Sequence, residues 1–176
     1  MINKKQGELN LNNNATYHTG QRIGVFVDVQ NLFYSAKSIF KGKINFKKLL
    51  ETSVKDRLLI RAIAYIVQKT EVDQSGFIEA LDRLGYEIKS KDLKVRGDGT
   101  AKGDWDMGIA IDSISIASKL DTIVLITGDG DFVPLVEMLK ATGCRVEVVS
   151  FERSTAHELI ESATEYFAIG EDLLLG

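Results

Sequence analysis

The chain alternates between short apolar runs and amphipathic segments. Runs of strand length that are rich in β-branched or alternating apolar residues are predicted to be strands. They span residues 23–28, 58–67, 86–95, 122–127 and 146–151. Segments with apolar residues at helical spacing are predicted to be helices. These span residues 31–40, 46–52, 73–84, 105–119, 132–142 and 155–168. The alternation predicts an α/β protein, a three-layer α/β/α sandwich with a mainly parallel central sheet.

The same pattern suggests one domain. Residues 1–21 are rich in Asn, Lys, Gln and Gly and show little periodicity, so we expect a flexible N-terminal tail. Residues 22–176 contain no repeat and no second set of elements, and we expect them to form a single domain. Residues 96–103 hold three glycines, a basic start and no apolar anchor, and are expected to form a mobile loop.

Composition excludes several classes of protein. Hydrophobic residues make up 44% and charged residues 27% of the chain, as in ordinary globular proteins, and no apolar run is long enough to span a membrane. The N-terminus lacks the apolar core of a secretory signal. The single cysteine, Cys144, excludes an internal disulfide, so a cytoplasmic location is expected. The two histidines, His18 and His157, leave little for a zinc site or a histidine-based triad.

Charge is distributed unevenly along the chain. The net charge is −3, yet residues 37–102 carry 15 Lys and Arg against 9 Asp and Glu, whereas residues 103–176 carry 4 against 14. A basic part beside an acidic part suits a metal-dependent nuclease, in which one part binds the phosphate backbone and the other binds metal. Two solvated surfaces of unequal composition would explain the distribution equally well.

Carboxylates gather where the strands of the predicted sheet end. Asp28 ends the first strand, Asp129 and Asp131 follow the strand at 122–127, and Asp104 and Asp106 begin the helix before it. Ligands bind beyond the carboxyl ends of such strands. Converging carboxylates repel one another and need a cation, and oxygen ligands select Mg²⁺ or Mn²⁺. Such an ion can activate water for phosphodiester hydrolysis.

Each cluster also has a simpler interpretation. Gly-Asp-Gly-Asp is common in turns, where the two glycines flanking Asp129 permit a tight bend and a close approach of the backbone to a ligand. Asp131 would then serve only as a helix N-cap, and Asp104 and Asp106 would only favour a helix N-terminus. Asp28 alone would be a strand-end turn residue. The expected placement at one sheet edge is what favours a joint function.

Three segments give the sequence a resemblance to a known family. They are Val25-Phe26-Val27-Asp28-Val29-Gln30-Asn31, Lys102-Gly103-Asp104-Trp105-Asp106 leading to Asp112, and Thr127-Gly128-Asp129-Gly130-Asp131-Phe132. With these residues the chain resembles the NYN domains, which are PIN-like ribonucleases, and within them the LabA-like branch. Residues 146–151 followed by Glu158-Leu159 are similar to the closing strand and helix of that family. The resemblance covers residues 22–175.

The resemblance implies a metal-dependent ribonuclease with an acidic site for Mg²⁺ or Mn²⁺ that acts on RNA, with single-stranded RNA as the expected substrate. Asp28, Asp106 and Asp129 would bind the metal, with Asp131 as a further catalytic residue. Asp104 rivals Asp106, because the match needs one extra residue after Gly103. Supporting roles would fall to Asn31, Asp104, Asp112 and Thr127. Asp112 lies about 240° around the helix from Asp106 and cannot share its face.

Contacts with RNA are expected from basic residues around the glycine-rich segment. Lys102, Arg96 and Lys94 could bind phosphates, although a solvated strand edge also explains them. Trp105 could stack on a base or anchor the core.

Rival functions remain open on the sequence. A regulatory or RNA-binding module could retain the acidic site with little turnover. A phosphatase of the haloacid dehalogenase kind needs a second aspartate two residues after the nucleophile, and Asp28 is followed by Val29 and Gln30. The apolar helix at 105–119 indicates deep burial or a subunit interface, so a homodimer is an alternative to a monomer.

Overall fold

The computed structural model describes residues 19–69, 71–95, 97 and 101–175, and for residues 95, 101 and 102 the backbone alone. Residues 1–18 of the expected tail lie outside the described part. So do Arg96 and residues 98–100 of the expected loop.

A six-stranded sheet forms the centre of the molecule, with the strand order β4-β3-β1-β7-β8-β9. All five pairings within this sheet are parallel, so the strands end at a common edge. The strands are β1 Arg22–Asp28, β3 Leu58–Gln68, β4 Glu87–Asp92, β7 Thr122–Ile126, β8 Arg145–Ser150 and β9 Glu165–Ala168. The predicted parallel sheet is confirmed.

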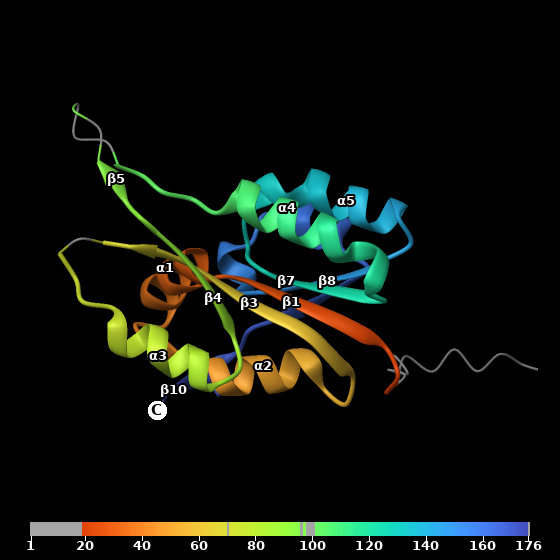
Figure 1. The fold of residues 1–176 in the computed structure, drawn as a ribbon, viewed down its shortest axis with the longest axis horizontal. Helices are drawn as coiled ribbons and strands as arrows, with labels where there is room; N and C mark the ends of the chain where they lie inside the picture. Colours follow the sequence, from red (N-terminus) through yellow and green to blue (C-terminus); the bar gives the residue numbers. More distant parts are fainter. Residues whose placement is uncertain (1–18, 70, 96, 98–100, 176) are drawn as a thin grey trace, which may run out of the picture.

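Helices cover both faces of the sheet (Figure 1). On one face lie α1 Val29–Ile39, α2 Phe46–Val54 and α3 Ser75–Arg83, and on the other α4 Asp106–Ile116, α5 Val133–Ala141 and α6 His157–Ser162. Successive strand residues point to opposite faces. Val25 and Val27 pack with the first set of helices, and Phe26 packs with the second. The inner strands are apolar on both faces because helices bury both.

Local signals end and begin the helices. The Asn45 side chain caps α2 by accepting a 3.0 Å hydrogen bond from the Lys48 amide. Gly85 and Gly143, which follow α3 and α5, have φ values of 94° and 93°, where glycine avoids the strain that a side chain would meet. These stops return the chain to the next strand.

The predicted helix at residues 155–168 is wrong in its second half. The helix α6 ends at Ser162, and β9 pairs in parallel with β8, with Glu165 opposite Glu147. Tyr166 donates a 3.0 Å hydrogen bond from its hydroxyl to the Ser150 carbonyl oxygen. Pairing with the backbone of β8 and these contacts favour a strand at residues 165–168 over continuation of the helix.

The predicted strand at 86–95 and the predicted loop at 96–103 also differ from the structure. The strand divides into β4 and a two-residue strand, β5 Lys94–Val95, which pairs antiparallel with β6 Ala101–Lys102. The end of the predicted strand and residues 101–102 of the expected loop therefore form a hairpin. A second small antiparallel pair joins β2 Lys43–Ile44 to β10 Leu174–Leu175.

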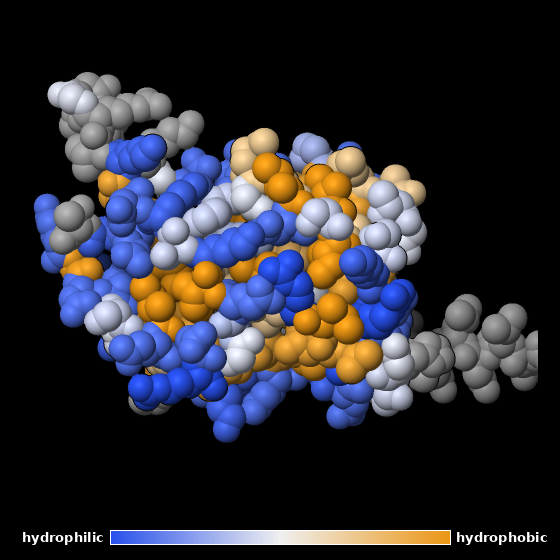
Figure 2. Space-filling model, in the orientation of Figure 1, coloured by the Kyte–Doolittle hydropathy of each residue, from blue (hydrophilic) through white to orange (hydrophobic). Residues whose placement is uncertain are grey.

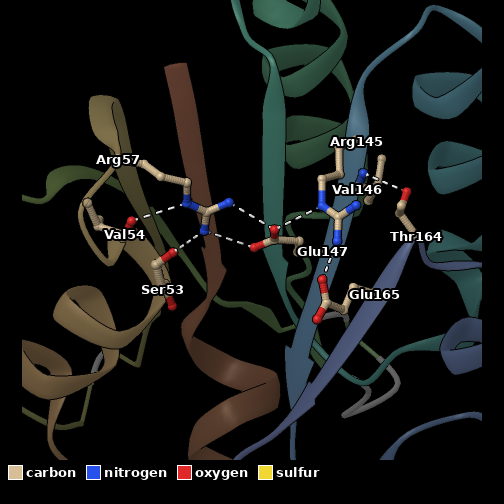
Figure 3. A network of polar contacts seen from close by, with 8 residues as sticks. All are labelled: Ser53, Val54, Arg57, Arg145, Val146, Glu147, Thr164 and Glu165. Atoms are coloured by element: carbon tan, nitrogen blue, oxygen red, sulfur yellow. Dashed lines mark hydrogen bonds and ion pairs between the residues drawn. The ribbon is translucent and has the colours of Figure 1, made fainter. Parts of the chain in front are cut away.

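A buried ion-pair network connects the beginning of β3 to β8 and β9 (Figure 3). The two terminal guanidinium nitrogens of Arg57 donate to the carboxylate of Glu147, over 2.8 Å and 2.9 Å. The side chains of this pair are 0% and 2% exposed. Arg145 bonds to both Glu147 and Glu165. Each buried charge of the network thus has an oppositely charged partner, as burial of charge requires.

Helix α4 is apolar on its outer face as well as on its inner face. Ile109 is buried, whereas Met107, Ile111 and Ile114 are 72%, 59% and 39% exposed. Apolar surface is visible over this helix in Figure 2. Deep burial of the whole helix is therefore not found. Within the described residues, no helix has both the length and the apolar character needed to cross a membrane.

Candidate metal and active site

The first component of the site is Asp28, the last residue of β1 and the N-cap of α1. Its Oδ1 accepts a 3.1 Å hydrogen bond from the Asn31 amide, and its Oδ2 accepts one of 3.2 Å from the Thr127 hydroxyl. Burial raises the pKa of Asp28, and these two bonds oppose the shift. The carboxylate is thus fixed on both sides at the common edge of the sheet.

The second component is the turn after β7. The Gly128 amide donates to Asn31 Oδ1 over 3.0 Å, and the Asp129 amide donates to Thr127 Oγ1 over 3.3 Å. Asp129 Oδ1 accepts from the Asp131 amide over 3.0 Å and caps a short 3₁₀ helix, Gly130–Phe132. The sequence signal of an apolar strand followed by Gly-Asp-Gly-Asp thus becomes a rigid turn that presents two carboxylates.

The glycines of this turn are required for space. Their φ values are not in the left-handed region, which among the described glycines is occupied by Gly85 and Gly143. A Cβ atom at Gly128 would lie 3.0 Å from the Ser154 carbonyl oxygen, and one at Gly130 would lie 2.9 Å from Ala156 Cβ. The backbone at these glycines therefore lies close to the segment just before α6. The sequence had predicted a close approach to a ligand.

The third component comes from the opposite face of the sheet. Asp106 is the first residue of α4, and one carboxylate oxygen each from Asp106, Asp129 and Asp131 lies within 4.8 Å of the others. We call these three residues the aspartate trio. Asp28 lies outside the trio, but its charge acts on Asp106. The sequence predicted Asp28, Asp106 and Asp129 as the metal ligands. The trio in the structure contains Asp131 in place of Asp28.

Negative charge dominates the electrostatics of the trio. Burial, and after it the charges of Asp104, Asp129, Asp28 and Asp131, together raise the pKa of Asp106 to about 6. In the part of the chain that the structure describes, none of the ion pairs with Lys or Arg involves these five carboxylates. Oxygen-only donors with uncompensated charge suit Mg²⁺ or Mn²⁺, so the residues present fit such an ion.

The two rival aspartates at the start of α4 differ in position. Asp106 belongs to the trio, whereas Asp104 is exposed and lies outside it. The charge of Asp104 still acts on Asp106 and Asp28. Of the two aspartates, Asp106 therefore lies in the trio and Asp104 does not.

Asp112 faces the sheet and not the trio. Its Oδ2 accepts two hydrogen bonds of 2.7 Å, one from the Tyr65 hydroxyl and one from the Lys89 ammonium. Tyr65 lies on β3 and Lys89 on β4, so Asp112 joins α4 to this side of the sheet. Neither partner was foreseen, because they lie 47 and 23 positions away and no local motif connects them.

Trp105 is a core anchor. Its indole N–H donates a 2.9 Å hydrogen bond to the Ile66 carbonyl oxygen, and its ring centroid lies 5.4 Å from that of Tyr65. The Lys91 ammonium lies 4.6 Å from the indole centroid. These contacts occupy the ring and explain a partly buried tryptophan just before α4.

The expected RNA-binding residues lie at the β5–β6 hairpin. Lys94 is exposed and pairs with Lys102 across the hairpin, while Arg96 falls outside the described residues. The hairpin follows β4, the edge strand on the Asp28 side of the sheet. The structure places the two lysines opposite each other.

Known proteins resemble this chain over most of its length. It is 30% identical to the low amplitude and bright protein LabA of Synechococcus elongatus over 159 residues, which are 85% of this chain and 84% of the relative. It is also 30% identical to an uncharacterised protein of Methanocaldococcus jannaschii over 100 residues, which are 56% of this chain and 38% of that protein.

Structural comparison agrees. A crystal structure of a protein of unknown function from Vibrio parahaemolyticus superposes with a TM-score of 0.83 and 33% identity, covering 90% of this chain and 99% of that one. The NYN domain matches residues 22–170, which include every component of the site. The chain therefore belongs to the NYN domain family of PIN-like nucleases.

Proposed function

We propose that the protein is a metal-dependent ribonuclease that hydrolyses phosphodiester bonds of single-stranded RNA. The observation that carries the proposal is the aspartate trio, in which carboxylates from two separate elements lie within 4.8 Å of one another. Membership of a nuclease family supports a nuclease role. RNA as substrate and Mg²⁺ or Mn²⁺ as cofactor are the further steps that we propose.

The chain's own residues have distinct roles in this proposal. Asp106, Asp129 and Asp131 would bind the ion, and Asp28 would complete the site from the end of β1. Asn31 and Thr127 orient Asp28 and the turn that carries Asp129. A bound divalent ion supplies an activated water and stabilises the charge that develops on the phosphate. Substrate would approach over the basic side of the sheet edge, where Lys94 is exposed.

Two further properties belong to the same proposal. A reducing compartment such as the cytoplasm suits Cys144, a buried thiol whose Sγ lies 3.2 Å from the Ala117 carbonyl oxygen. The exposed apolar residues Met107, Ile111 and Ile114 of α4 offer a face for a homodimer. Sedimentation of the wild type beside Ile111→Lys tests the dimer, since a charge at this face should leave only monomer.

The nuclease proposal is tested with purified protein, Mn²⁺ and a labelled single-stranded RNA. We expect the wild type to cleave the RNA and Asp129→Asn to abolish cleavage, because the variant loses a ligand of the trio. The matched control is Asp82→Asn. Asp82 is exposed on α3, on the face of the sheet opposite α4, and this variant should cleave like the wild type. Equal degradation by wild type and Asp129→Asn would indicate a contaminating nuclease and refute the assignment.

The same assay distinguishes the alternative of a regulatory module with little turnover. Calorimetry with Mn²⁺ reports the trio independently of cleavage. Binding of Mn²⁺ that Asp129→Asn abolishes, without any cleavage of RNA, would favour the regulatory alternative over the enzyme.

A further inference from the structure

Two adjacent aromatic side chains are exposed on α1. Phe33 and Tyr34 are 57% and 50% exposed. Every other aromatic side chain in the described part of the chain is buried or half-buried. Aromatic rings gain most from burial, so a neighbouring pair that remains in solvent is a surface that a ligand can cover.

Contacts hold the pair in a defined arrangement. The two ring centroids lie 6.5 Å apart with an interplanar angle of 77°. The Lys69 ammonium donates a 3.2 Å hydrogen bond to the Tyr34 hydroxyl and lies 5.5 Å from the centroid of its ring. Lys69 directly follows β3, so the bond joins α1 to the end of a sheet strand. A ring fixed in this way loses little side-chain entropy when a ligand stacks on it.

The helix that carries the pair begins at the acidic site. Asp28 caps the helix that carries both rings, and Asn31 bonds that helix to the turn after β7. Tyr34 is six residues beyond Asp28, a rise of about 9 Å along the helix. Lys69 follows β3, the neighbour of β1 on the side away from β7. A chain that leaves the trio across the end of β1 would therefore run along α1 toward the rings.

The charges that act on Tyr34 are positive. Helix α1 contains no acidic residue, and Lys37 stands in its last turn. Lys69 and Lys37 both act electrostatically on the Tyr34 hydroxyl. Aromatic faces among lysines suit a single-stranded polyanion with flat bases better than an apolar peptide or a second copy of this chain.

We propose that Phe33 and Tyr34 form a base-stacking platform that binds single-stranded RNA as it leaves the aspartate trio. The proposal deepens the ribonuclease assignment and rests on it for the identity of the ligand. Phosphate binding by Lys69 and Lys37 accompanies the stacking. The platform contributes affinity for bases of any sequence, because every base has a stacking face.

The test measures binding in EDTA, where no cleavage occurs, by fluorescence anisotropy with a labelled eight-nucleotide RNA. A second oligonucleotide of the same length has the same backbone but no bases. We expect the wild type to bind RNA about 10- to 100-fold more tightly than the abasic oligonucleotide, as stacking of one or two bases predicts. The double variant Phe33→Ala/Tyr34→Ala should lose this preference and retain its weak binding of the abasic strand.

Matched variants separate stacking from other effects. Phe33→Tyr and Tyr34→Phe keep an aromatic ring and should keep the preference for bases. Met138→Ala removes an equally exposed apolar side chain, 50% exposed on α5, and should bind as the wild type does. Both rings are exposed, so the double variant is expected to unfold at the wild-type temperature.

Several results would overturn the platform. One is unchanged RNA affinity in the double variant, and another is equal loss of affinity for RNA and for the abasic strand. A wild type that binds no RNA, or a double variant that only converts a dimer to a monomer in sedimentation, would overturn it as well. Cleavage in Mn²⁺ is scored separately. Base-dependent binding without cleavage would support the platform and refute the nuclease. Cleavage by the wild type, with unchanged RNA affinity in the double variant, would support the nuclease and refute the platform.

Discussion

Asn31 and Gly128 are 97 positions apart in the sequence, yet the Gly128 amide donates a 3.0 Å hydrogen bond to the side-chain oxygen of Asn31. The bond joins the first turn of α1 to the turn after β7. Asp28 lies before one of these residues and Asp129 after the other. The bond therefore fixes the separation of two carboxylates that come from neighbouring strands.

Removal of this bond should loosen the metal site. We expect Asn31→Ala to weaken Mn²⁺ binding about 10- to 100-fold, as loss of an orienting partner commonly does. The free energy of unfolding should fall by about 1 kcal/mol. Asn45→Ala is the control, because Asn45 caps α2 with an equivalent bond to Lys48. It should cost a similar free energy of unfolding and leave Mn²⁺ affinity unchanged in calorimetry. Equal Mn²⁺ affinity in all three proteins would contradict a bracing role.

Asp106 should make stability depend on pH in the absence of metal. Burial and the neighbouring carboxylates together raise the pKa of Asp106 to about 6, against ~3.9 in an unfolded chain. The folded protein thus binds the proton more tightly, and its free energy of unfolding falls as pH rises from about 4 through about 6. We expect Asp106→Asn to gain roughly 1–2 kcal/mol at pH 7.5, discounted for partial exposure, and little at pH 4.

The measurement is urea unfolding in EDTA at both pH values. Asp82→Asn, an exposed aspartate on α3, should show no such dependence. A less stable Asp106→Asn at pH 7.5 would show that the carboxylates do not repel one another as described.

Asp112 should contribute to stability and not to metal binding. Asp112→Ala leaves the Tyr65 hydroxyl and the Lys89 ammonium without their carboxylate partner. We expect a loss of about 1–3 kcal/mol in the free energy of unfolding and a change in Mn²⁺ affinity of less than about threefold. Asp106→Ala should show the opposite pattern. A large loss of Mn²⁺ affinity in folded Asp112→Ala would assign this residue to the site.

The buried ion pair between Arg57 and Glu147 should contribute more to the free energy of unfolding than an exposed ion pair does. Arg57→Ala leaves a carboxylate that is 2% exposed without its bidentate partner, and we expect a cost of about 3–5 kcal/mol. Arg61 and Glu87 form a comparable pair on adjacent strands, but their side chains are 32% and 49% exposed. Arg61→Ala should therefore cost less than about 1 kcal/mol in the same urea titration. Similar costs for both variants would argue against the role of burial.

Periodicity was sufficient to predict the central sheet and most helices, because strands such as β7 are buried on both faces and read as continuous apolar runs. It failed at residues 165–168, where a strand forms only because β8 is there to pair with. The pairing of Lys94 with Lys102 was also not predictable, since few apolar residues mark that hairpin.

The site itself was partly predictable. Strand ends identify the neighbourhood of Asp28 and Asp129 from the chain order alone. Which carboxylates lie closest together depends on how α4 packs on the opposite face. This packing places Asp106, and not Asp104, beside Asp129 and Asp131. The partners of Asp112 are long-range contacts, and no spacing in the sequence encodes them.

The parallel sheet places the aspartates at one end of its strands and the buried Arg57–Glu147 pair at the other. Arg57 lies just before β3 begins, at the end of the sheet remote from the aspartates. Surface residues of α1 and of the β5–β6 hairpin can therefore diverge among relatives without disturbing that interior pair. Ligand preference can therefore change at the end that carries the aspartates, while the buried ion pair at the other end keeps the fold stable.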